Sequence, residues 1–183
     1  ERPGRRLDIA DAVRTAIHIG AGLHHLHRAG FLHLDLKPAN LLLRDSVPVL
    51  VDFDAARRID PTRRPRVALG TAPYMAPEHV ELRTLTPATD VYGLGAVLYE
   101  LVTGRWPFEA VYTREETRSG RERLHPQLGS SPPPPPARFR QEITPSLDET
   151  IQRCLRRDPA ERFPDMHPLL LALVDELPEP DTL

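Results

Sequence analysis

The chain is organised around the sequence His33-Leu34-Asp35-Leu36-Lys37-Pro38-Ala39-Asn40. This stretch places a carboxylate and an amide five residues apart, with a lysine between them and a proline that holds the turn. A carboxylate can accept a proton, an ammonium group can neutralise an oxyanion, and an amide oxygen can complete a metal shell. A second acid, Asp52, follows Asn40 by twelve residues. Together these four polar groups could surround a metal-bound phosphate.

The composition limits the class of protein. The 183 residues suffice for one well-buried domain, and 24 basic against 26 acidic residues give a net charge of −2. This balance predicts neither nucleic-acid binding nor membrane contact. The single cysteine, Cys154, excludes an internal disulfide and fits a small core residue in a reducing, cytoplasmic compartment. No apolar run approaches the roughly 20 residues of a membrane span.

Upstream of the central stretch, apolar residues at steps of three and four predict a helix over residues 8–29, with Asp8 as its N-cap and Gly30 as its stop. Two of the three histidines near its end, His24 and His27, could share a face and hold a metal ion. We favour a structural interpretation of these histidines, because no acid or cysteine completes a set of ligands.

Downstream, residues 31–32 predict a short strand, and residues 41–43 and 47–51 predict a hairpin with a polar turn. The acids at positions 35 and 52 would therefore lie on loops at strand ends, where a scaffold can hold them. Residues 54–69 carry five arginines and predict a mobile loop. Such a loop could dock an acidic or phosphorylated partner or could simply be solvated, and the sequence favours neither.

A strongly apolar helix is predicted over residues 87–103, with Thr86 or Thr89 as its cap and Gly104 as its end. Because it is apolar nearly all round, it is expected at the middle of the domain. Asp90 lies in its first turn, and a buried carboxylate there needs donors such as the backbone N–H groups of a neighbouring loop.

The remainder of the chain is less regular. Residues 109–145 include five consecutive prolines, 132–136, and are predicted to be poorly ordered, as a connector more than a docking site for a partner. Two helices are predicted over about 146–156 and 165–177. The last six residues, 178–183, are expected to form a frayed tail.

These motifs, taken in order, resemble the eukaryotic-type protein kinases, in particular the bacterial serine/threonine kinases. Residues 33–40 resemble the catalytic loop, Asp52-Phe53-Asp54 resembles the D-F-G motif, and Ala76-Pro77-Glu78 resembles the A-P-E motif that closes an activation segment at 52–78. The resemblance implies an α+β, protein kinase-like fold. It implies that residues 1–177 form the mainly α-helical C-terminal lobe of the kinase domain, and that the N-terminal lobe is absent from this chain.

The resemblance also implies a role for each matching residue. Asp35 is expected to orient the substrate hydroxyl and accept its proton, and Lys37 to lie beside the transferred γ-phosphate, as in serine/threonine kinases. Asn40 and Asp52 are expected to hold Mg²⁺ ions that bridge the phosphates of ATP. Thr71 lies where the family has a substrate-side threonine. Other carried-over residues are expected to bind the cofactor (Leu42) or to be structural (His33, Phe53, Glu78, Asp90 and Arg162, with Glu78 and Arg162 as a buried ion pair).

The sequence departs from the family pattern in three ways. No glycine-rich loop and no V-A-I-K-like strand lysine precede residue 8. Leu34 stands where the family has an arginine that pairs with a phosphorylated activation loop, so control through Thr62 is predicted to be weak or absent. Asp54 replaces the glycine of D-F-G, which adds a carboxylate near the expected Mg²⁺ and ATP.

Two functions remain open at this point. The first is a protein serine/threonine kinase that transfers the γ-phosphate of ATP to protein substrates, present here as a fragment without its N-terminal lobe. The retained acid, lysine, amide and threonine favour it. The second is a catalytically impaired pseudokinase scaffold or protein-binding module, which the expected absence of the N-terminal lobe, Leu34 and Asp54 favour.

Overall fold

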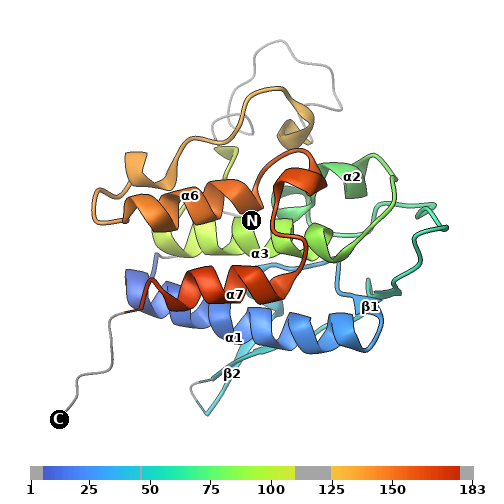
Figure 1. Ribbon diagram of the computed structural model, residues 1–183, viewed down its shortest axis with the longest axis horizontal. Helices are drawn as coiled ribbons and strands as arrows, with labels where there is room; N and C mark the ends of the chain where they lie inside the picture. Colours follow the sequence, from blue (N-terminus) through green and yellow to red (C-terminus); the bar gives the residue numbers. More distant parts are fainter. Residues whose placement is uncertain (1–5, 46, 110–124, 178–183) are drawn as a thin grey trace.

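The computed structural model describes residues 6–45, 47–109 and 125–177, and it is built mainly from helices (Figure 1). The helices and strands are α1 (Ile9–Arg28), β1 (Phe31–Leu32), β2 (Leu41–Arg44), β3 (Val47–Leu50), β4 (Arg57–Arg58), α2 (Pro77–Val80), α3 (Pro87–Thr103), α6 (Pro145–Cys154) and α7 (Met166–Val174). Single turns of 3-10 helix lie at Pro38–Asn40, Ala72–Tyr74, Pro126–Leu128, Pro136–Arg138 and Pro159–Glu161.

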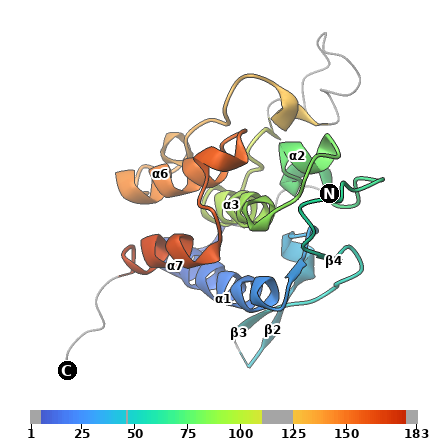
Figure 2. The same cartoon turned by 45° about the vertical axis from the view of Figure 1, so that its right-hand side comes forward.

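Helix α3 forms the centre of the fold, as its apolar sequence predicted. It lies between α6 on one side and α1 with α7 on the other (Figures 1 and 2). Val91 and Val102, near its two ends, are both fully buried. Thr86 and Thr89 share the capping role in a reciprocal capping box, and the helix ends at Gly104, whose φ of 72° suits glycine.

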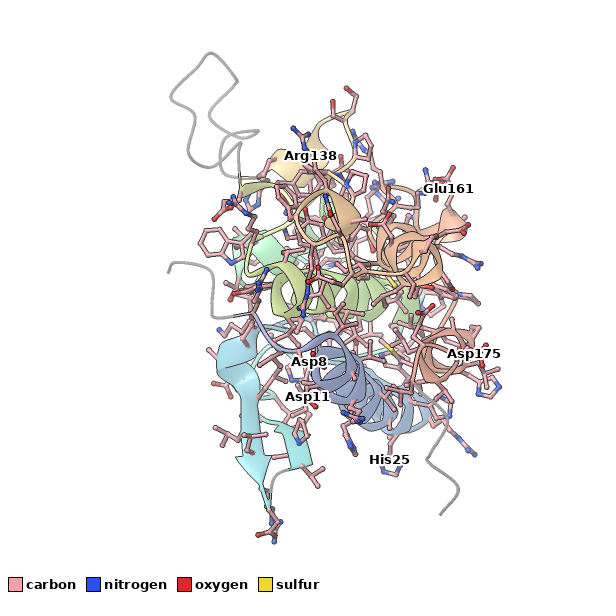
Figure 3. The ribbon with its side chains drawn as sticks, turned by 90° about the vertical axis from the view of Figure 1, so that its left-hand side faces the viewer. Asp8, Asp11, His25, Arg138, Glu161 and Asp175 are labelled. Atoms are coloured by element: carbon pink, nitrogen blue, oxygen red, sulfur yellow. The ribbon has the colours of Figure 1, made fainter. Side chains whose placement is uncertain are left out.

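Helix α1 confirms the prediction of a long helix before the central stretch. The Asp8 carboxylate caps it by accepting a hydrogen bond from the Ala10 N–H at 2.9 Å. The polar residues Asp11 and His25 lie on its outer face (Figure 3), while residues such as Leu23 are buried against the neighbouring helices. Within the described ranges no group of three or more His, Cys, Asp or Glu side chains could hold a metal ion.

The strands form two small antiparallel sheets. Strands β2 and β3 pair as the predicted hairpin, with Leu41 opposite Leu50. Strands β1 and β4 pair with Leu32 opposite Arg57. Strand β4 lies inside residues 54–69, which were predicted to be a loop throughout, because two residues are too few to leave a period in the sequence.

The stretch before α6 departs most from its prediction. The prediction of poor order over 109–145 is wrong for residues 125–145, which follow a defined path against α3 and α6. The Tyr99 hydroxyl donates to the Pro134 carbonyl at 3.0 Å, and the Ala137 N–H donates to Asp148 at 2.7 Å. The proline run therefore lies along the helices as an extended strap. Residues 110–124 and the predicted tail at 178–183 lie outside the described residues.

The last two helices are slightly shorter than predicted, ending at Cys154 and Val174. Cys154 is buried at their junction with α3, where burial raises the pKa of its thiol to about 12, so it is an unreactive core residue. Among the described residues, no helix has the length and apolar character needed to cross a membrane.

Candidate active site

The backbone of the central stretch is fixed by one buried carboxylate. Asp90, in the first turn of α3, accepts hydrogen bonds from the backbone N–H groups of His33 at 2.8 Å and Leu34 at 2.9 Å. The Asp90 carboxylate has a third partner in the His27 side chain, whose Nε2 lies 2.8 Å from Oδ2. Leu34 has a φ of 70°, which is unfavourable for leucine, and the paired N–H contacts hold it there. This is the kind of contact that the sequence predicted for Asp90.

Asp35 lies at the centre of four polar contacts, three of them to its side chain and one to its backbone carbonyl. Lys37 Nζ donates to Asp35 Oδ2 at 2.9 Å, and Thr71 Oγ1 donates to Oδ1 at 2.9 Å. Asn40 Nδ2 lies 2.9 Å from the Asp35 carbonyl and 3.1 Å from Oδ2. The structure therefore brings together Asp35, Lys37, Asn40 and Thr71, although 30 residues of sequence lie between Asn40 and Thr71.

These contacts also set the charge of the carboxylate. Partial burial would raise the pKa of Asp35, but the hydrogen bonds from Lys37, Thr71 and Asn40 outweigh it, and its pKa is lowered. Asp35 is therefore an anion at neutral pH, with one lysine ammonium beside it. A carboxylate in this state can orient a hydroxyl group and accept its proton as a bond to oxygen forms.

Asn40 and Asp52 are brought together by the hairpin. The Val51 N–H donates to the Asn40 carbonyl at 3.0 Å, which continues the β2–β3 pairing to its open end, immediately before Asp52. Asp52 is exposed and has a φ of 65°. The hydrogen bonds of Asn40 use its amide nitrogen, so its amide oxygen and the Asp52 carboxylate are oxygen donors of the kind that Mg²⁺ prefers.

A ring contact between His33 and Phe53 links the loop at residues 33–40 to the residues that follow strand β3. Their rings meet edge to face at 5.1 Å between centroids, and the His33 side chain is fully buried. Burial lowers the pKa of His33, and the nearby carboxylate of Asp90 offsets only part of this effect, so the imidazole is neutral. Phe53 is half exposed, and Leu42, predicted to contact the cofactor, is 55% exposed on strand β2.

The loop that carries Thr71 comes very close to the central stretch at Gly70. A Cβ atom built on Gly70 would lie 3.0 Å from the Leu34 carbonyl oxygen and 3.1 Å from Met75 Cγ. Gly70 also has a φ of 150°, which few other residues adopt. The absence of a side chain at this position lets Thr71 reach Asp35.

The far end of the same segment is held by the predicted ion pair. The Arg162 guanidinium donates two parallel hydrogen bonds to Glu78, each 2.8 Å long, and both side chains are buried. Its remaining N–H groups donate to the backbone carbonyls of residues 88, 156 and 157. All five guanidinium donors are therefore satisfied, which is the condition for burying such a charge.

Two further contacts around the Thr71 loop were missed by the sequence interpretation. The Tyr74 hydroxyl donates to Glu100 at 2.5 Å and accepts from Trp106 Nε1 at 3.2 Å. Gln127 donates from Nε2 to the carbonyls of residues 72 and 75, at 3.1 and 3.0 Å. The tyrosine lies in a segment that the sequence had singled out, but Gln127 lies between irregular residues and gave no periodic signal.

Comparison with known proteins gives the family: residues 3–170 match the family described as Protein kinase domain, and the chain belongs to that family. This confirms the resemblance to the bacterial serine/threonine kinases.

Three curated relatives show the extent of the similarity. The serine/threonine-protein kinase PkaA of Streptomyces coelicolor is 41% identical over 160 residues, which cover 84% of this chain and 27% of that protein. PknA of Corynebacterium glutamicum is 34% identical over 178 residues, covering 94% of this chain and 35% of that protein. PknB of Mycolicibacterium smegmatis is 31% identical over 172 residues, covering 83% and 24%. The chain thus spans between 24% and 35% of the length of these relatives.

Proposed function

We propose that this chain carries the phosphoryl-transfer site of a protein serine/threonine kinase and forms the C-terminal lobe of its kinase domain. The relatives are named serine/threonine-protein kinases, and the helical architecture around α3 agrees with such a lobe. The proposed reaction moves the γ-phosphate of ATP to a serine or threonine hydroxyl of a protein substrate.

The observation that carries this proposal is the set of contacts at Asp35. The carboxylate is anionic, faces Thr71 on one oxygen and Lys37 on the other, and can orient an incoming hydroxyl and take its proton. In the proposed reaction, Lys37 neutralises charge on the transferred phosphate, and its contact with Asp35 supports this role. Catalysis of phosphoryl transfer consists mostly of positioning and charge stabilisation, and these groups supply both.

The residues present also fit the proposed cofactors. Asn40 and Asp52 offer two hard oxygen ligands at the open end of the hairpin, and Mg²⁺ commonly takes one or two protein ligands together with phosphate oxygens. When bound, Mg²⁺ would neutralise the phosphates and hold them in line for transfer. Leu42, half exposed on strand β2, is proposed to offer an apolar surface for the base of the nucleotide.

Control of the site is proposed to be independent of phosphorylation of Thr62. Leu34, at the position of the usual arginine, is 6% exposed and packs with Leu32 and Leu85 in a small apolar cluster. A leucine in this environment cannot make a charge-assisted hydrogen bond to a phosphate. Thr62→Ala in the complete protein is therefore expected to retain activity.

A second candidate function is a protein-binding scaffold without catalysis. Asp54 favours it, because this residue adds a carboxylate beside the Asp52 ligand, and its backbone N–H lies 3.3 Å from Asp52 Oδ1. Two like charges at a metal site can either recruit a second cation or repel the phosphates.

Transfer of labelled γ-phosphate by the complete protein, with Mg²⁺ and a mixture of protein substrates, tests the proposal. Asp35→Asn is expected to lower the rate by at least about a hundredfold, as loss of a general base does. Asp45→Asn is the matched control, since it neutralises an exposed acid at the hairpin turn and should leave the rate unchanged.

Thermal unfolding with and without Mg²⁺ and ATP separates the two functions. Binding to the folded state must raise the unfolding temperature. A rise in unfolding temperature without any transfer, and no difference between the native protein and Asp35→Asn, would support the scaffold and refute the kinase.

A further inference from the structure

A cavity of about 470 Å³ lies apart from the Asp35 site, along the segment that follows strand β4. This segment projects beyond β1 and β4, on the side away from α6 and α7 (Figure 2). The residues that line the cavity are Leu32, Arg57, Arg58, Asp60, Arg63, Arg64, Pro65, Arg66 and Leu85. None of them belongs to the set proposed for phosphoryl transfer.

The side chains that line this cavity, which we call the arginine cavity, carry mostly positive charge. Five of the nine lining residues are arginines, and Asp60 is the one acid among them. The Asp60 carboxylate is already engaged, since Oδ1 accepts hydrogen bonds from the Thr62 N–H at 2.9 Å and the Thr62 hydroxyl at 2.6 Å. In the described part of the chain, none of the five guanidinium groups forms an ion pair. The cavity therefore has a surplus of positive charge that an anion can neutralise.

The cavity is held in shape by the fold. Arg57 and Arg58 form strand β4, so the pairing with β1 fixes their backbone. Pro65 is buried and anchors the loop that carries the other arginines. The floor is apolar, since Leu32 and Leu85 are 2% and 7% exposed. Guanidinium walls over an apolar floor suit a ligand with an anionic head and a short apolar stem.

We propose that the arginine cavity binds a phosphorylated side chain of a second protein. The planar guanidinium group donates paired hydrogen bonds that match phosphate, and several such groups around one cavity match its multiple oxygens. A nucleic acid would need a basic stripe along its backbone, whereas this charge is confined to one cavity of a chain whose net charge is −2.

The phosphate is delivered from outside the chain. Thr62 is the hydroxyl residue nearest in sequence to the arginines, but its hydroxyl is bonded to Asp60. A phosphate on Thr62 would lie beside the Asp60 carboxylate, and like charges at that distance repel. Thr62 is also absent from the lining of the cavity.

The test measures binding alone and needs neither ATP nor transfer, so its outcome is independent of the proposed kinase activity. The probe is a fluorescein-labelled peptide, Ala-Gly-Ala-phosphoserine-Ala-Gly-Ala, titrated with the chain and followed by fluorescence anisotropy. The same peptide with serine or glutamate at the centre is the comparison. The phosphopeptide is expected to bind at least about tenfold more tightly than the serine or the glutamate peptide, because hydrogen bonds between guanidinium and phosphate groups are charge-assisted and often paired.

The variant Arg63→Gln/Arg64→Gln is expected to weaken binding of the phosphopeptide by at least about tenfold. Both residues are exposed, so the fold should be kept, and circular dichroism checks this. The matched control is Arg14→Gln/Arg28→Gln, which removes the same charge from helix α1 and should change the affinity less than about twofold.

Three results would overturn the proposal. The first is equal binding of the serine or glutamate peptide. The second is an equal loss of affinity in the helix α1 control, which would show that total charge alone attracts the peptide. The third is loss of binding when the chain carries phosphothreonine at position 62, which would show that the cavity is filled from within the chain. Unchanged binding by that phosphorylated chain and by Thr62→Ala supports delivery by a second protein.

Discussion

Replacement of Glu78 by glutamine tests whether the buried ion pair with Arg162 holds the end of the 52–78 segment. The substitution keeps the size of the side chain and removes its charge. Arg162 then remains buried, because its other hydrogen bonds to three backbone carbonyls still hold it in place. An uncompensated guanidinium charge is left inside the protein, and this is the unfavourable state from which the effect arises.

The magnitude follows from burial. The side chains of Arg162 and Glu78 are 0% and 2% exposed. Removing one partner of such a pair typically lowers the free energy of unfolding by about 3–5 kcal/mol. Since domains of this size are stable by only about 5–15 kcal/mol, the loss is a large fraction of the total. Each kcal/mol corresponds to about 2–4 °C in unfolding temperature for a chain of this length, so a decrease of at least about 6 °C is expected.

Urea unfolding of the chain, followed by circular dichroism, measures the effect as a lower midpoint at unchanged slope. Glu81→Gln is the matched control, because Glu81 lies three residues on and pairs with Arg83 and Arg157 at the surface. Partly exposed pairs contribute at most about 1 kcal/mol. If the two substitutions lowered the free energy of unfolding equally, the buried pair would contribute no more to stability than the surface pair, and the reasoning from burial would be refuted.

Three other predictions concern Thr71, which contacts Asp35, and two residues, Asp90 and Gln127, that hold the loops of the site. Because the folded pKa of Asp35 lies below its ordinary value of 3.8, its stabilising contribution is present above that pH and is lost as pH falls through the folded pKa. Thr71→Val removes a donor and should raise this pKa, as read from the carboxyl carbon by NMR; a lowered or unchanged pKa would contradict it. Asp90→Asn weakens the acceptor of three donors and should lower the free energy of unfolding, measured in urea, by about 2–4 kcal/mol. A decrease of less than about 1 kcal/mol would show that these contacts contribute little to stability. Gln127→Leu leaves two backbone carbonyls without their donor and should speed hydrogen exchange at the Tyr74 amide, while unchanged exchange would mean that Gln127 does not hold this turn.

The sequence could predict those parts of the fold that repeat or that carry a rare combination of residues. Helices α1 and α3 extend over enough turns for their apolar period to appear, and their caps at Asp8 and Gly104 have strong local preferences. The pairing of Glu78 with Arg162 was predicted only through the family resemblance. Eighty-four residues separate the two, and no local pattern connects them.

The sequence could not predict features that depend on tertiary contact. Strand β4 exists because β1 lies beside it, and its two residues have no pattern of their own. The proline strap is defined by the Tyr99 hydroxyl and by Asp148, which lie on helices whose placement was unknown. The role of Gln127 depends on two carbonyls more than fifty residues away. In each case the local structure is determined by a partner that is distant in the sequence, and not by the residue's own local pattern.

The close approach at Gly70 has a consequence for how this site tolerates mutation. A single nucleotide change converts a glycine codon to an alanine codon, and the added methyl group would meet the Leu34 carbonyl at 3.0 Å. None of the polar groups around Asp35 would be altered, yet the two loops would have to separate. Position 70 is therefore sensitive to the smallest available substitution, because the added methyl group would press on both the Leu34 carbonyl and Met75, next to the contact between Thr71 and Asp35.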